Sequence, residues 1–434
     1  MSILLVLLVF SVSIAPNSAI ASSPVPGSPC KKQGRVQIID QKLYKCTKYK
    51  KQLLWSAGKN TKVSSGATRS TSKYWIDKSC SFSKGDCPQL SNNELFPEIR
   101  NCKISDATRY RPPGASEEIS GNGFPRPTIS YKNVNKPLVG IIPVSFIDFP
   151  FTPNLESQLS DEYAKAIKFY AETSYGSANI SFETIAKKYW ISIPYTWKEW
   201  STKNNDDLVT ITKSIIAYLY EVDLQKYDSI FFGTSKSTSF YWGGGTQEIY
   251  ENSFGKVKNV YFTVGGRNLG LEHNLGHTLY LLEDLYVHPW NVSSVGERAN
   301  KTIRYDIMSG GENYSGWNRW LNGWLTDQDV SCLPTGEKTL TVRINFLEEK
   351  SGKRLLVIPE SQFTGIFIEY RGALNKEGKG ILLYRLNSEI SHGYGPIEGT
   401  PDLISSGESK DFYGYRFKVI GGDDVSAYLL ITKI

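Results

Sequence analysis

Apolar residues in the middle of the chain follow two different periods. An apolar, partly β-branched run at 138–146 predicts a buried strand, and the segments SIFFGT (229–234) and NVYFTV (259–264) predict two more. Helical spacing recurs in two sets, each of which predicts a helix: Leu155, Leu159, Tyr163, Ile167 and Tyr170, then Leu208, Ile211, Ile215, Leu219 and Val222. A further helix is predicted around His273 and His277, so this part of the chain mixes strands and helices.

The spacing of apolar residues changes after Cys332. Short segments, separated by turn residues, are alternating or apolar throughout and show no helical period: 338–345, 354–359, 365–371, 380–386, 412–420 and 426–434. Such a series of strands without helices predicts a C-terminal β-sandwich. Together with the mixed segment before it, the chain is predicted to belong to the α+β class.

The first 136 residues fall into segments of different composition. An apolar run followed by Ala19-Ile20-Ala21 predicts a signal peptide at 1–21, cleaved before Ser22. Residues 22–57 read as a small basic module with cysteines, 58–73 as a flexible Ser-, Thr- and Lys-rich linker, and 74–136 as an irregular Cys- and Pro-rich pre-segment. The mixed segment then covers 137–335 and the β-sandwich 336–434.

The signal peptide predicts a secreted or cell-surface protein. No Lys or Arg precedes its apolar run, so retention as an anchor is an alternative to cleavage. No later segment holds enough uninterrupted apolar residues to span a membrane. A formal net charge of +7 is mild for 434 residues and gives little support for nucleic-acid binding. The oligomeric state is left open.

Six cysteines in an apparently exported chain indicate disulfides rather than a zinc cluster, and none forms a C-x-x-C pair. Proximity suggests two pairs and leaves a third: Cys30 with Cys46, Cys80 with Cys87, and Cys102 with Cys332.

Histidine is scarce, which makes its placement informative. Three of the four histidines fall within 16 residues. Positions i and i+4 share one face of a helix, so His273 and His277 can present ring nitrogens to one zinc ion. Glu283 or Asp284 could supply a third ligand from the turn after the helix. For His288 three alternatives stay open: a ligand, an oxyanion stabiliser or a surface residue.

Five blocks together resemble the immune inhibitor A type of secreted metallopeptidases, in order over about residues 136–335: KPLVGIIPVSFIDFP, FYAETSYGSANISFETIAKKYWISIP, HNLGHTLYLLEDLY, DIMSG and GWNRWLNGWLTDQDVSC. The resemblance implies a zincin-type, metzincin-like domain followed by a β-domain. It makes His273 and His277 zinc ligands and Met308 the methionine turn beneath the zinc. Zn²⁺ is the implied cofactor, and Ca²⁺ is allowed but has no assigned residues.

The family pattern H-E-x-x-H-x-x-G-x-x-D is broken at three places. Asn274 replaces the general base, Tyr280 replaces the glycine of the turn, and the acidic ligand is Glu283 at the family offset or Asp284 one residue later. Asparagine takes up no proton near neutral pH, although it can hold a water by hydrogen bonds. Glu272, on the other side of His273, is expected to be a solvated charge or a charge in the first turn of the helix.

Two functions are therefore predicted. One is a zinc metallopeptidase that acts on extracellular proteins or peptides with impaired catalysis. The other is an inactive pseudopeptidase that binds a peptide or surface ligand in the same cleft. No G-x-S-x-G elbow, P-loop or dinucleotide glycine pattern supports a different enzyme class.

Overall fold

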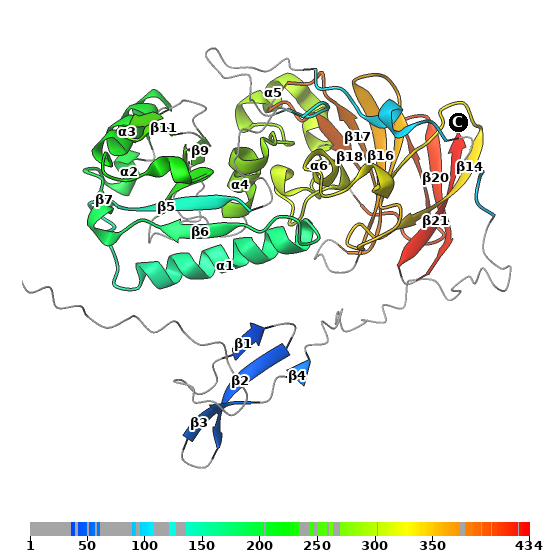
Figure 1. Cartoon of the computed structure of the whole chain (residues 1–434). Helices are drawn as coiled ribbons and strands as arrows, with labels where there is room; N and C mark the ends of the chain where they lie inside the picture. The colour runs from blue at the N-terminus through cyan, green and yellow to red at the C-terminus, as the bar shows by residue number, and fades with distance from the viewer. Residues whose placement is uncertain are drawn as a thin grey trace, which may run out of the picture. The chain divides into compact units, whose positions relative to one another are not determined.

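The computed structural model (Figure 1) divides the chain into two compact units, residues 1–73 and 74–434. The residues that it describes are 36–39, 42–49, 52–56, 59–60, 89–92, 96–107, 121–126, 136–200, 202–203, 205–233, 243–245, 250–257, 260–263, 270–301, 303–372, 378–391, 393–400, 402–423 and 425–434. The predicted signal peptide at 1–21 and the cysteines Cys30, Cys80 and Cys87 lie outside these residues.

The first unit contains a small sheet of four strands. β2 (Lys42–Tyr49) pairs antiparallel with β1 (Val36–Ile39), β3 (Gln52–Trp55) and β4 (Lys59–Asn60). The sequence analysis ended the module at residue 57 and began the linker at 58, whereas β4 begins at Lys59. Lys59 and Asn60 belong to the sheet because they pair with Leu43 and Lys42 of β2.

The second unit begins with a sheet in the strand order β6-β5-β8-β12-β9. Four of these strands are parallel neighbours: β5 (Leu138–Ser145), β6 (Ser181–Thr184), β8 (Ser229–Gly233) and β12 (Val260–Thr263). β9 (Gly243–Gly245) pairs antiparallel with β12, and the short β7 (Ile191–Ser192) extends the pairing of β5. The three strands predicted in this region are confirmed.

Helices cover both faces of this sheet (Figure 1). Alternate residues of β5 point to opposite faces, with Ile141 in one hydrophobic core and Ile142 in the other. α1 (Leu155–Thr173) and α4 (Gly270–Tyr280) contribute to the first core, whereas α2 (Trp197–Trp200) and α3 (Asn205–Tyr218) contribute to the second. The predicted helices are confirmed, although Ile167, counted on the apolar face of α1, is exposed and α3 ends before Leu219 and Val222. Burial on both faces explains the unbroken apolar run of β5.

Several short elements complete this region. They are the hairpin β10 (Tyr250–Asn252) and β11 (Gly255–Val257), the helices α5 (Val292–Val295) and α6 (Gly316–Leu321), and 3-10 turns at Ile99–Cys102, Lys187–Tyr189, Leu224–Lys226, Pro289–Asn291, Gly296–Lys301, Ile307–Ser309 and Asp327–Asp329.

The C-terminal part forms two sheets that share one hydrophobic core. The first has the order β13 (Val330–Cys332), β15 (Leu355–Pro359), β16 (Thr364–Arg371), β17 (Gly380–Asn387) and β18 (Ile397–Gly399). The second has the order β14 (Thr339–Asn345), β21 (Ser426–Lys433), β20 (Tyr415–Gly422) and β19 (Ser409–Phe412). All of the described elements together confirm the α+β class.

One predicted strand contains a turn. The segment 412–420 is apolar enough to read as a single strand, but β19 ends at Phe412 and β20 begins at Tyr415. Between them Tyr413 and Gly414 have φ values of 46° and 79°. Two consecutive residues with positive φ form the turn of a tight two-residue hairpin. Glycine is a usual residue in such a turn, whereas tyrosine is not.

The five-stranded sheet is buried on both faces. On one side Ile366 and Ile368 of β16 face the core shared with the other C-terminal sheet, while Phe367 between them joins the core of α1 and α4. Every residue of β16 is buried, so its sequence lacks the alternation of a one-sided strand. Residues on the two sides of the predicted boundary at 335/336 therefore pack into a common core.

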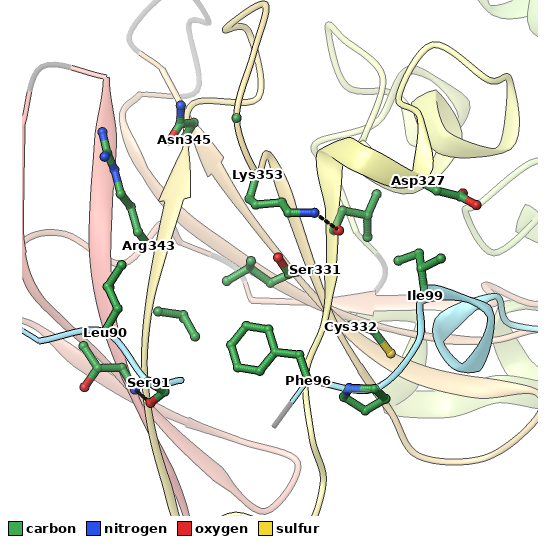
Figure 2. A pocket seen from close by; sticks show the side chains of 16 residues that line it. Leu90, Ser91, Phe96, Ile99, Asp327, Ser331, Cys332, Arg343, Asn345 and Lys353 are labelled. Carbon is green, nitrogen blue, oxygen red and sulfur yellow. Dashed lines mark hydrogen bonds between the residues drawn. The ribbon is translucent and has the colours of Figure 1, made fainter. Parts of the chain in front are cut away.

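The described parts of the pre-segment lie against this two-part body. Cys102 is joined to Cys332 by a disulfide, as expected from the sequence. Ser91 is hydrogen bonded to Thr341 of β14, through Ser91 N–H to the Thr341 carbonyl and Thr341 N–H to Ser91 Oγ. Between the pre-segment and the C-terminal strands lies an open groove of about 610 Å³ (Figure 2).

None of the helices in the described ranges has the length and apolar character needed to cross a membrane.

Candidate metal centre

Three side chains from α4 and the turn after it converge on one point. The Nε2 atoms of His273 and His277 are 3.0 Å apart, and each lies close to Oδ1 of Asp284, at 3.1 and 3.3 Å. Four ligands at the zinc bond lengths usual for nitrogen and oxygen stand about 3.3 Å from one another in a tetrahedron. The three atoms therefore match three corners of such a site, and among the described residues they form a group that could hold a metal ion.

The other nitrogen of each histidine is fixed by a backbone carbonyl. Nδ1–H of His273 donates to the carbonyl of Ile307 at 2.9 Å, and Nδ1–H of His277 donates to the carbonyl of Leu282 at 2.7 Å. In the neutral rings, these bonds place the proton on Nδ1 and leave the Nε2 lone pairs directed at the shared point. Metal-binding histidines are commonly oriented in this way by groups outside the ligand set.

The charges at this point are arranged to keep the carboxylate ionised. Burial would raise the pKa of Asp284, but the charge of His277 and the hydrogen bonds from the three surrounding histidines hold it well below its usual range. For His273, burial opposes the protonated form, but Asp284 outweighs it and raises the pKa. Three acceptor atoms this close together can be stabilised either by bound protons or by a cation. Metal-binding sites behave in this way.

The structure decides between the two candidate acidic ligands in favour of Asp284. Glu283 is 7% exposed and does not join the histidines; its Oε2 accepts a hydrogen bond from Nδ2 of Asn122 at 2.7 Å. Burial raises the pKa of Glu283 to about 8. Glu283 therefore lies outside the group of three converging side chains.

The end of α4 explains this one-residue offset. Leu281 has a φ of 50°, its N–H donates to the His277 carbonyl, and the N–H of Leu282 donates to the carbonyl of Gly276. A left-handed residue with this bond ends a helix. Tyr280 stands where the pattern that the sequence resembles has a glycine, and it is still helical, so the left-handed residue comes one position later than that pattern implies. A leucine in this conformation costs roughly 1–2 kcal/mol.

Two side chains from the pre-segment hold this turn. Nη2 of Arg126 donates to the carbonyls of Tyr280 and Leu281, at 2.7 and 3.0 Å, and Asn122 binds Glu283. The sequence analysis missed both residues because nothing in the local pattern GNGFPRP links it to a turn more than 150 residues away.

Met308 lies beneath the two histidines, in the 3-10 turn Ile307–Ser309. A Cβ at Gly276, between the histidines on α4, would stand 2.6 Å from Sδ of Met308 and 2.6 Å from the hydroxyl of Tyr314. The glycine thus allows the methionine turn to pack directly on the helix. Oδ1 of Asp306 accepts from Met308 N–H at 2.8 Å, which fixes the turn locally.

Asn274 is 1% exposed and lies about 100° around α4 from His273 and about 60° from His277. It is therefore beside the ligand face, where the general base of the family pattern would stand. Glu272 lies on the opposite side of His273, in the first turn of α4, which was one of the two alternatives. It is buried, and burial raises its pKa, so the solvated alternative is wrong.

His288 contacts Asp284 through the carboxylate oxygen that does not face the other two histidines. It is 8% exposed, and its Nε2 lies 3.0 Å from Oδ2 of Asp284, the oxygen that is not shared with His273 and His277. The surface alternative is thus wrong, and His288 is not one of the three converging ligands. It orients the Asp284 carboxylate instead.

The groove between the pre-segment and the C-terminal strands is a separate feature. It is lined by residues such as Phe96, Arg343 and Lys353, and the three converging side chains are not among them (Figure 2). The candidate chemistry therefore lies outside the groove.

No family model and no curated protein matches this chain. One solved structure, described as a chaperone–substrate complex, is 13% identical over 44% of this chain and 36% of its own, with a TM-score of 0.18. This likeness is too weak to carry an argument about fold or function.

Proposed function

We propose that this chain is a secreted zinc protein of the metallopeptidase type that acts on extracellular proteins or peptides, with hydrolysis slowed because Asn274 stands at the general-base position. The proposal includes a metzincin-like domain over 137–335 and a β-sandwich over 336–434. The observation that carries it is the convergence of His273, His277 and Asp284 on one point above the Met308 turn.

The donor set suits zinc. Two imidazole nitrogens and one carboxylate oxygen leave a fourth position open, which is the pattern of a catalytic rather than a structural site. A zinc ion held there would lower the pKa of its bound water and polarise a substrate carbonyl. His288 and the carbonyls of Ile307 and Leu282 would keep the ligands oriented during that chemistry.

Among the carboxylates that the structure describes around the site, none is an evident replacement for the general base. Asp284 is used as a ligand, Glu283 is hydrogen bonded to Asn122, and Glu272 lies on the other side of the helix. Asn274 can orient a water by hydrogen bonds but cannot accept its proton. This arrangement favours the second candidate function, a pseudopeptidase that keeps the metal cleft to bind a peptide.

An exposed apolar patch beside His288 supports a peptide as the ligand. We call it the Trp290 patch; it consists of Trp290, Val292 and Tyr394, of which Trp290 is 75% exposed. The Trp290 ring is 4.7 Å from that of His288, which binds Asp284. Tryptophan often dominates the binding energy where proteins recognise peptides and other proteins.

Replacing Trp290 with alanine should weaken the binding of an apolar peptide on the order of 10-fold, because a large exposed ring then no longer covers the peptide. Fluorescence anisotropy of a labelled apolar nonapeptide on the zinc-loaded chain measures the change. Phe254→Ala, at an exposed aromatic residue in the β10–β11 hairpin, is the control and should bind as the native chain does. Equal affinity for native and Trp290→Ala would remove the patch from the binding site.

The proposed function itself is tested by incubating the zinc-loaded chain with a reduced and alkylated protein, with and without a chelator. The missing base predicts slow cleavage that the chelator stops and that His277→Ala lacks. Zinc binding without any cleavage would select the pseudopeptidase. A chain that binds no zinc in equilibrium dialysis would contradict both candidates.

A further inference from the structure

Two charged residues of the C-terminal sheet are buried completely. Glu369 and Arg371 of β16 are 0% exposed, and Nε of Arg371 is 2.6 Å from Oε1 of Glu369. They lie on the same face of β16 as Phe367, which packs in the core of α1 and α4. The ion pair is therefore directed at the part of the molecule that holds the candidate metal centre.

The pair binds both ends of the loop that contains the methionine turn. Nη2 of Arg371 donates to the carbonyl of Tyr305 at 2.5 Å, and Oε2 of Glu369 accepts from Gly316 N–H, also at 2.5 Å. Between these two anchors, Oδ2 of Asp306 accepts from Ser315 N–H at 2.6 Å, which closes the loop from inside. The loop 305–316 is thus fixed at its ends by the C-terminal sheet.

This loop supplies the carbonyl that orients the first histidine. Ile307 lies two residues after Tyr305, and its carbonyl accepts the Nδ1–H of His273. The C-terminal part also reaches the third ligand, because Gly393 accepts a hydrogen bond from His288 N–H at 2.9 Å and His288 contacts Asp284. Two of the three converging side chains are therefore oriented through residues after 336.

General stability is a weak reason for such an ion pair. A buried pair loses its hydration, and replacement by apolar residues of similar size is often neutral or stabilising. What apolar residues could not do is hold the Tyr305 carbonyl and the Gly316 N–H at fixed positions. Directed hydrogen bonds of this kind orient ligands in metal sites.

We propose that Glu369 and Arg371 are positioning residues of the metal centre, which set the loop 305–316 so that the Ile307 carbonyl holds His273 ready to bind metal. The inference rests on the proposed metal site. It goes beyond that site by making the C-terminal sheet a working part of the centre rather than an appended module.

The test compares two changes in the full-length chain, Glu369→Gln and Asp329→Asn. Each removes the charge of a carboxylate that pairs with a buried arginine, since Asp329 pairs at 2.5 Å with Arg354, the residue before β15. Both variants should unfold at a lower temperature than the native chain. Only Glu369→Gln should lose zinc affinity, by about 10–100-fold, in competition with a chromophoric chelator.

A milder variant keeps the proposal testable if Glu369→Gln does not fold. Tyr384→Phe removes the hydroxyl that donates to Glu369 at 3.1 Å, while the ring can keep its stacking on Phe367. It should weaken zinc binding in the same direction and change the visible spectrum of the Co²⁺-loaded chain. Native zinc affinity and a native Co²⁺ spectrum in this variant, or equal zinc loss in Asp329→Asn, would overturn the proposal. A native chain without zinc affinity would instead refute the proposed function.

Discussion

Replacing Asn274 with glutamate should accelerate peptide hydrolysis by about 10²–10⁴-fold, the usual contribution of general acid–base catalysis. The residue lies beside His277 on the ligand face of α4, where a carboxylate could accept a proton from a water at the open fourth position. The measurement is kcat/KM of the zinc-loaded variant on a fluorogenic peptide, with a chelator present in a parallel reaction.

Asn274→Gln is the matched control for this change. Asn274 is buried, so a longer side chain strains its surroundings whether or not it carries a charge. Glutamine has the length of glutamate without its basicity, and it should leave the rate at the native level or below. If the glutamate and glutamine variants were equally slow while both bound zinc, the missing carboxylate would not be the reason for low activity.

Asp284→Asn should weaken zinc binding by about 10²–10³-fold. A structural site with four ligands contributes roughly 10–16 kcal/mol, so that one ligand accounts for about 3–4 kcal/mol. Asp284 also carries the negative charge that faces both histidines. Isothermal titration with Zn²⁺, in the presence of a competing chelator, measures the loss.

Glu283→Gln provides the comparison one residue away. Burial raises the pKa of Glu283 to about 8, so this carboxyl is mainly protonated at pH 7 and glutamine resembles it in shape and charge. Zinc affinity should therefore stay at the native value. The opposite result, zinc loss in Glu283→Gln and none in Asp284→Asn, would mean that the acidic ligand keeps the family offset and that the turn differs from the one described.

The identity of the third ligand shows where sequence reasoning ended. The spacing of His273 and His277 places both on one helical face, whatever surrounds the helix. The next ligand depends on the residue at which the helix ends. Leu281 takes the left-handed conformation there, and leucine carries no signal for it. The sequence therefore left Glu283 and Asp284 as alternatives.

The burial of charged and polar residues was the other feature that the sequence did not predict. Glu272 read as a solvated or first-turn charge, and a surface position stayed among the three alternatives for His288, because charged and polar residues are usually exposed. The hydroxyl of Tyr170 on α1 donates to the backbone carbonyl of Glu272, and Gly393 of the C-terminal part binds the backbone of His288. Both contacts join segments about 100 residues apart, so no local sequence pattern predicts them.

Features that depend on near neighbours can be read from the amino-acid order. The apolar periods predicted the strands and helices, and the spacing placed His273 and His277 on one helical face with Asn274 beside them. The contact of Asp284 with this pair, and the hydrogen bonds from Glu369 and Arg371 to the ends of the loop 305–316, arise only in the folded chain. The physical reason is that periodicity records which side of an element is apolar, whereas the orientation of a ligand depends on hydrogen bonds from distant parts of the chain.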